Sequence, residues 1–144
     1  MVDIAACFRQ YGWTCEEVDA GVWHSTFAVE AISGGIYDRY VLAADDWVQL
    51  AVSPLIATTH VNAPERLHSF LLHANQDLRL ARLALDADGD VNLLVDLPAP
   101  HTTPELFGQV LELMAYYAGE LAPQLRAAAG DGRTAFPSET GDST

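Results

Sequence analysis

The sequence predicts a single α+β domain in which an antiparallel sheet packs against helices. Three observations support this prediction: apolar residues at helical spacing in three segments, apolar residues at period two in others, and an Asp-Gly turn between two β-rich runs. The expected order is helix, three strands, helix, two strands, helix (α-β-β-β-α-β-β-α). With 144 residues, the chain has the length of one domain and can bury a core without disulfides.

A short amphipathic helix is predicted over residues 4–11. Asp3 suits the N-cap position, because its carboxylate can accept a hydrogen bond from a backbone N–H of the first turn. Gly12 follows at the position where helices often end in a left-handed residue. The apolar residues share one stripe of this helix: Ile4, Cys7, Phe8 and Tyr11.

Three strands follow as an antiparallel meander between residues 13 and 55. The Ser33-Gly34-Gly35 segment predicts the loop after the first strand, and Asp45-Asp46 predicts a tight connection after the second. Pro54 is expected to close the third strand, because proline cannot donate a hydrogen bond to a neighbouring strand. The expected strands are residues 23–29, 39–44 and 47–52.

A helix and then a β-hairpin are predicted over the next thirty or so residues. Pro64 lies in the first turn of the helix, where its missing N–H costs little. The turn Asp86–Asp90 joins the two strands of the hairpin, and Gly89 can adopt the positive φ that such turns require. The apolar helix residues are Leu67, Phe70, Leu71, Ala74 and Leu78, and the strands are residues 82–85 and 91–95.

The last predicted helix begins after Thr103, a good N-cap residue, with Pro104 at the first helical position. Pro123 is expected to bend or stop this helix. The domain is expected to span residues 1–128, and residues 129–144 are expected to form a disordered tail. The buried stripe is predicted to contain Phe107, Val110, Leu111, Met114, Ala118, Leu121 and Leu125.

The last helix carries more apolar residues than one contact with a sheet requires. Leu106, Leu113, Tyr116 and Tyr117 fall outside its main stripe. Exposed apolar patches commonly mark partner surfaces, and a symmetric homodimer is the commonest way to cover one. These four residues, together with Trp47, are the candidate partner-binding residues, although tryptophans of a small domain more often lie in the core.

Charge and composition exclude several functional classes. Twenty acidic residues face seven basic ones, all arginine, which gives a net charge of −13. This balance disfavours nucleic-acid binding and favours a basic or amphipathic partner. No apolar run reaches the ~20 residues of a membrane span, and the N-terminus lacks the basic region of a signal peptide. The two cysteines suit reduced thiols, so a cytoplasmic location is expected.

No catalytic, metal or cofactor motif is evident. Asp86, Asp88 and Asp90 alternate as calcium ligands do, but the twelfth position of such a loop is Leu97 rather than glutamate. His68 and His73 are five residues apart, so they do not share a helix face as an i, i+4 ligand pair would. Without lysine, Schiff-base chemistry is excluded. The sequence therefore predicts a protein that is not an enzyme and binds no cofactor.

A family resemblance is carried by Leu71–Asn75, Ala81–Leu85, Asp88–Val91, Asp96–Pro98, the closing helix Phe107–Leu121 and, more loosely, Trp47–Leu55. These segments resemble the YbjN-like family, which has the fold of the class I type III secretion chaperones. The resemblance covers about two-thirds of the chain and implies an α+β fold, a commonly dimeric state, and a role in holding other polypeptides. It implies no catalytic or cofactor residues.

Three functions remain open on the sequence. The first is a non-catalytic protein-binding module, chaperone-like or a regulatory adaptor, that holds another polypeptide and forms a homodimer. The second is a small-molecule-binding or enzymatic domain, with a pocket between the sheet and the second helix near Trp47, His68 and His73. The third is an acidic immunity or inhibitor-type partner. An exposed apolar patch would favour the first, and a closed pocket with convergent polar groups the second.

Overall fold

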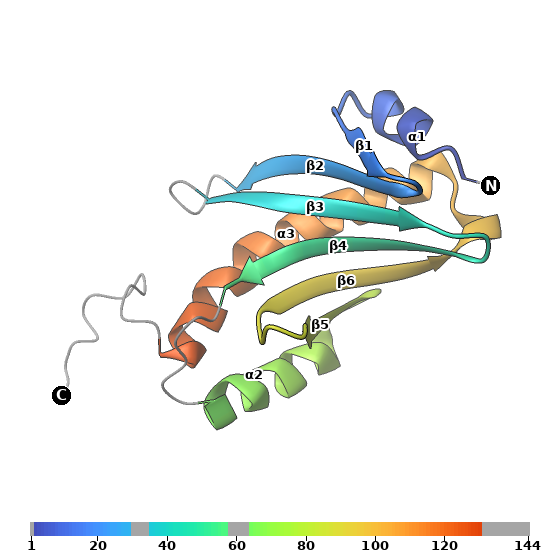
Figure 1. Ribbon diagram of the computed structural model, residues 1–144. Coiled ribbons are helices and arrows are strands. Elements are labelled where there is room, and N and C mark those ends of the chain that lie inside the picture. Colours follow the sequence, from blue (N-terminus) through green and yellow to red (C-terminus); the bar gives the residue numbers. More distant parts are fainter. Residues whose placement is uncertain (1, 30–34, 58–63, 131–144) are drawn as a thin grey trace.

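A computed structural model describes residues 2–29, 35–57 and 64–130 of the chain (Figure 1). It confirms the predicted α+β class, and it contains one strand more than expected before the second helix. The elements are α1 (Ile4–Gln10), β1 (Glu16–Asp19), β2 (Val22–Val29), β3 (Gly35–Ala43), β4 (Trp47–Ile56), α2 (Pro64–Asp77), β5 (Ala81–Leu85), β6 (Val91–Pro98), a 3-10 turn (Ala99–His101) and α3 (Pro104–Ala129).

The strands form one antiparallel sheet in the order β1-β2-β3-β4-β6-β5. The additional strand, β1, is four residues long, and all four are exposed. A strand this short and polar has no alternation of buried and exposed residues, so periodicity could not reveal it. It pairs with only the first part of β2, from Val22 to His24.

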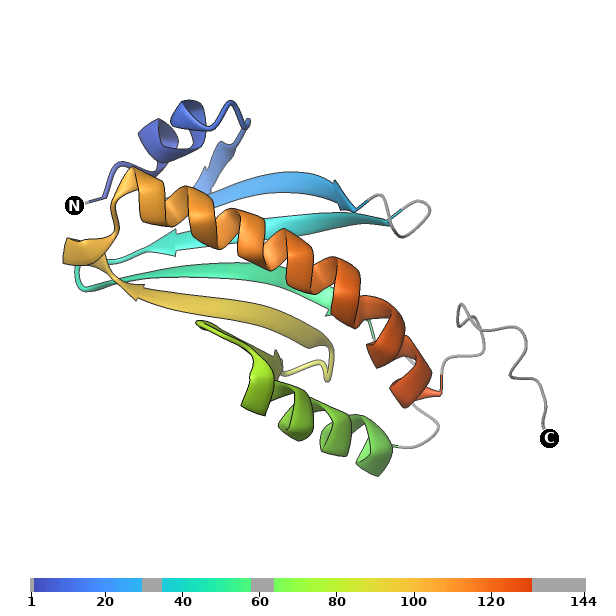
Figure 2. The ribbon, with the colours of Figure 1, turned by 180° about the vertical axis from the view of Figure 1, so that it is seen from behind.

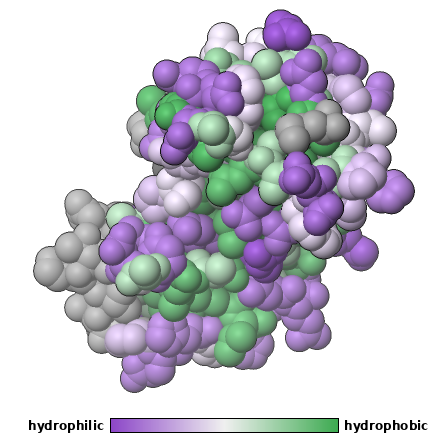
Figure 3. All heavy atoms as spheres, turned by 45° about the vertical axis from the view of Figure 1, so that its right-hand side comes forward, coloured by the Kyte–Doolittle hydropathy of each residue, from purple (hydrophilic) through white to green (hydrophobic). Residues whose placement is uncertain are grey.

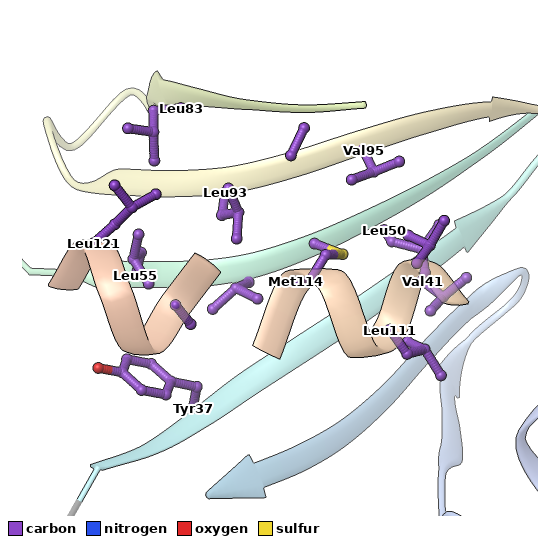
Figure 4. Close-up of a cluster of buried hydrophobic side chains, with 14 of the residues drawn as sticks. Tyr37, Val41, Leu50, Leu55, Leu83, Leu93, Val95, Leu111, Met114 and Leu121 are labelled. Atoms are coloured by element: carbon purple, nitrogen blue, oxygen red, sulfur yellow. The ribbon is translucent and has the colours of Figure 1, made fainter. Parts of the chain in front are cut away.

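Helix α3 crosses one face of the sheet and forms the core with it (Figure 2). Its buried residues Leu111, Met114 and Leu121 meet inward-facing residues of the central strands, such as Leu50 and Leu93 (Figure 4). The predicted N-caps of α1 and α3 are confirmed. Thr103 accepts the Leu106 N–H at 3.1 Å, and Asp3 accepts the Ala6 N–H at 3.0 Å.

The prediction for Pro54 is wrong, and of the two effects expected of Pro123, a bend or a stop, the structure contradicts the stop. Strand β4 does not close at Pro54 but runs on to Ile56. Its pairing with β6 shifts register between Val52 and Ile56, and such a bulge accommodates a residue that cannot donate to the sheet. Helix α3 does not stop at Pro123 either, because the buried Ala122 and Leu125 around that proline hold the last turns against the core.

The hairpin of β5 and β6 is confirmed. The Asp86 carboxylate accepts the backbone N–H groups of Asp88 and Asp90 at 2.9 and 3.0 Å, and Gly89 has a φ of 84°. Helix α2 lies beside β5 (Figure 1), where the Asn75 side chain both donates to the Leu83 carbonyl and accepts its N–H. This contact occupies backbone groups of the sheet edge that would otherwise remain unpaired.

The end of the predicted domain is only partly described. Ala129 is the last residue of α3, and Gly130 caps the helix with a φ of 74°. The remainder of the expected disordered tail, residues 131–144, lies outside the described residues, as does the predicted Ser33-Gly34 loop. The 1–128 boundary therefore stays a prediction.

Candidate functional site

None of the helices in the described part of the chain packs across the face of the sheet opposite α3 (Figure 1). Successive residues of a strand point to opposite faces, so the pairing registers identify the side chains on this surface. We call it the open face. From β2 to β5 it contains Val22, His24, Thr26 and Ala28; Ile36, Asp38, Tyr40 and Leu42; Trp47, Gln49 and Ala51; Asn92, Leu94, Asp96 and Pro98; Arg82 and Ala84.

Apolar side chains are frequent on the open face. Ile36, Leu42 and Trp47 are 70%, 40% and 54% exposed, high values for large apolar residues. In the register of the sheet, Tyr40 lies opposite Ala51, which in turn lies opposite Leu94. Apolar residues thus cross the three central strands. Seen as spheres, the molecule has several hydrophobic areas separated by hydrophilic ones (Figure 3).

Five polar residues of the open face bind one another. His24 Nε2 lies 2.8 Å from Asp38 Oδ1, and Arg82 Nη1 lies 2.7 Å from Asp96 Oδ2. The Gln49 side-chain amide donates to the other Asp96 oxygen at 2.9 Å. Because these groups satisfy each other across neighbouring strands, none of these polar pairs converges on an open position as an acid–base pair would.

The structure does not bring the five candidate partner-binding residues to one surface. Trp47 lies on the open face, whereas Leu106, Leu113, Tyr116 and Tyr117 belong to α3 on the other side of the sheet. Leu106 and Tyr117 pack partly against the core, and Leu113 is half-buried. The Tyr117 hydroxyl also accepts the Arg79 N–H at 2.9 Å. Tyr116, at 62% exposed, is the most accessible of the four.

Sequence reasoning missed Ile36 and Leu42. Both alternate with the inward-facing Tyr37 and Val41 along β3, so this strand carries large apolar residues on both faces. That pattern is typical of a strand covered on both sides. Here one side is uncovered, and an apolar strand of this kind is the sequence signal that would have indicated a binding surface.

A hollow of about 630 Å³ lies between α2 and the end of α3, not between the sheet and α2 as the small-molecule alternative expected. His73 lines it, with its Nδ1 2.8 Å from the Ser69 carbonyl oxygen, whereas Trp47 points to the open face and His68 is exposed on α2. Arg66 donates from Nε to the Ala128 carbonyl across its wall. The polar groups named here therefore already have backbone partners.

The cysteines and the acidic residues do not form a reactive site in the described part of the chain. Burial raises the pKa of the Cys7 thiol, and it also raises the pKa of Cys15, where Arg9 opposes the effect. Both thiols are therefore poor nucleophiles at neutral pH. Among the described residues, no three His, Cys, Asp or Glu side chains are grouped as a metal site, and no helix is long and apolar enough to cross a membrane.

Solved structures share this fold at low sequence identity. A chain of the heterodimeric ExoU–SpcU complex from the Pseudomonas aeruginosa type III secretion system aligns with a TM-score of 0.61 and 13% identity, over 88% of this chain and 99% of that one. YbjN from E. coli aligns with a TM-score of 0.57 and 15% identity, over 84% and 90%. The Yersinia pestis type III secretion chaperone SycH, in complex with a fragment of YscM2, aligns with a TM-score of 0.51 and 17% identity, over 81% and 93%.

These similarities confirm, at the level of the fold, the resemblance to YbjN-like proteins and type III secretion chaperones. No family model matches the sequence, and no curated protein matches it.

Proposed function

We propose that this protein is a non-catalytic binding module of the cytoplasm, which holds a segment of another polypeptide against the open face of its sheet. The observation that supports this proposal best is the exposure of Ile36, Leu42 and Trp47 on a face where the carboxylates of Asp38 and Asp96 already have partners. Such a surface gains free energy when an apolar segment covers it. The solved complexes with this fold, which contain protein partners, support the same proposal.

The net charge indicates what kind of segment would bind. With a net charge of −13, the protein attracts basic polypeptides and repels acidic ones. On the open face, the carboxylates of Asp38 and Asp96 lie on either side of the apolar residues that cross the central strands. An amphipathic segment with apolar residues flanked by Lys or Arg matches this pattern, and its binding should weaken as salt concentration rises.

The first test uses a panel of fluorescently labelled, basic amphipathic peptides of about 15 residues. We expect micromolar binding to the wild type, and at least tenfold weaker binding to Leu42→Asp, because a charge replaces an apolar contact at the interface. The emission of Trp47 should shift to the blue as the peptide covers it. Fluorescence anisotropy measures the affinities.

Leu72→Asp is the matched control, since Leu72 is 74% exposed but lies on α2. Equal loss of affinity in both variants, or no binding by any peptide of the panel, would contradict the proposal.

We also propose that the protein is a homodimer through the apolar residues of α3. Light scattering at micromolar concentration should give twice the mass of the chain. Tyr116→Glu should shift the protein towards the monomer, because Tyr116 is 62% exposed on that helix. Gln109→Glu, an exposed polar position of α3, should leave the mass unchanged. A single-chain mass at every concentration would rule out the dimer.

A further inference from the structure

Leu80 combines two unfavourable features in the turn between α2 and β5. Its φ is 64°, and among the described residues it is the one non-glycine residue with a positive φ. A residue with a Cβ atom is strained in this region, which glycine usually occupies. Leu80 is also 61% exposed, so its apolar side chain gains little from the core. Strain of this kind is commonly retained where it serves a function.

The turn that contains Leu80 adjoins the most exposed apolar residue of α3. The Arg79 N–H donates to the Tyr117 hydroxyl at 2.9 Å, which ties the turn to the helix. The Tyr117 ring lies 5.9 Å, centre to centre, from the ring of Tyr116, which is 62% exposed. Leu80 directly follows Arg79 in the chain. Two exposed apolar side chains, Leu80 and Tyr116, therefore lie next to Tyr117, and we call these three residues the turn patch.

Opposite charges border the turn patch. The Arg79 side chain is exposed and forms no ion pair with a described residue. The same holds for Glu120, which lies four residues after Tyr116 and three after Tyr117, and therefore on their side of α3. A surface that carries a cation and an anion beside apolar side chains is complementary to a copy of itself related by a twofold axis.

We propose that Leu80 is an anchor of the homodimer and packs against Tyr116 of the partner subunit, while Arg79 of each protomer faces Glu120 of the partner subunit. This inference rests on the proposed homodimer and specifies its contacts. In a twofold interface each contact occurs twice. Burial of Leu80 supplies the apolar contacts that the single chain lacks and offsets the strain of its backbone. The paired charges offset the repulsion between two chains that each carry a net charge of −13.

The decisive experiment uses two variants of complementary charge, Arg79→Glu and Glu120→Arg. Each variant alone places like charges at both contacts of the twofold interface, so each should have the mass of a single chain in light scattering where the wild type has twice that mass. An equimolar mixture restores opposite charges at both contacts. The mixture should therefore form a dimer of one chain of each kind, which native mass spectrometry identifies. Mixing cannot reverse an effect that is confined to one chain.

A second experiment tests the apolar anchor. Leu80→Gly should weaken dimerisation about tenfold or more, as measured by light scattering in a dilution series. Its urea midpoint, measured at a concentration where wild type and variant are both monomeric, should not fall, because glycine adopts this φ without strain. Leu72→Ser is the matched control, since Leu72 is 74% exposed on α2 outside the turn patch, and it should leave the mass unchanged.

The outcomes separate this interface from the proposed homodimer itself. A wild-type dimer that persists in Leu80→Gly and in both charge variants would overturn the interface and leave the homodimer intact. Equal weakening by Leu72→Ser and Leu80→Gly would also overturn it, as would an equimolar mixture that keeps the mass of a single chain. A wild type with the mass of a single chain at every concentration would overturn the homodimer and this interface together.

Discussion

Replacing Arg39 by methionine should raise the free energy of unfolding by about 1–3 kcal/mol, because methionine fills similar volume without a desolvated charge. The guanidinium is buried among three aromatic rings and lacks a carboxylate partner. Arg39→Ala should instead destabilise the protein, since it leaves a cavity in the core. Urea unfolding followed by circular dichroism measures both changes.

Arg82→Met provides the control, since Arg82 is exposed and paired with Asp96. Arg82→Met should change the free energy of unfolding by less than about 1 kcal/mol. A lower urea midpoint for Arg39→Met than for Arg82→Met would contradict this prediction. It would mean that the aromatic contacts of the Arg39 guanidinium and its hydrogen bond to the Ser25 hydroxyl outweigh the cost of burying the charge.

The pH dependence of the stability difference between Arg39→Met and the wild type follows from the direction in which burial shifts the pKa of Arg39. Because the folded-state pKa of Arg39 is lowered to about 10, both states keep this proton throughout the neutral range. The stability difference between Arg39→Met and the wild type should therefore be constant from about pH 5 to 8. Above the folded pKa the unfolded state binds more protons than the folded one. The wild type should then gain stability relative to the variant as pH rises.

Leu111→Ala should lower the free energy of unfolding by about 3–4 kcal/mol. Leu111 is fully buried on the face of α3 that meets the sheet (Figure 4), so truncation removes apolar contacts and leaves a cavity. Leu113→Ala is the matched control, because Leu113 is half-buried on the same helix and should cost less than about 1.5 kcal/mol. Similar urea midpoints for the two variants would show that α3 does not pack as described.

Local chemistry was sufficient to predict much of the fold. The caps at Asp3 and Thr103, the Asp-Gly turn at Gly89 and the apolar stripes of α2 and α3 are decided by residues close in sequence. Each has a physical signal within one or two turns of chain. Strand β4 does not close at Pro54 and α3 does not stop at Pro123, because contacts with distant parts of the chain outweighed the local preference at the β4–β6 bulge and under the last turns of α3.

The sites depended on the tertiary structure. By itself, the sequence determined an acidic α+β domain without catalytic motifs, since composition and periodicity are properties of the chain alone. Only the folded sheet decided which face of β3 is uncovered. That choice exposes Ile36 and Leu42 and buries Arg39. Period two assigns side chains to two faces but does not say which face a helix covers. That choice depends on where α3 packs, far away in the sequence.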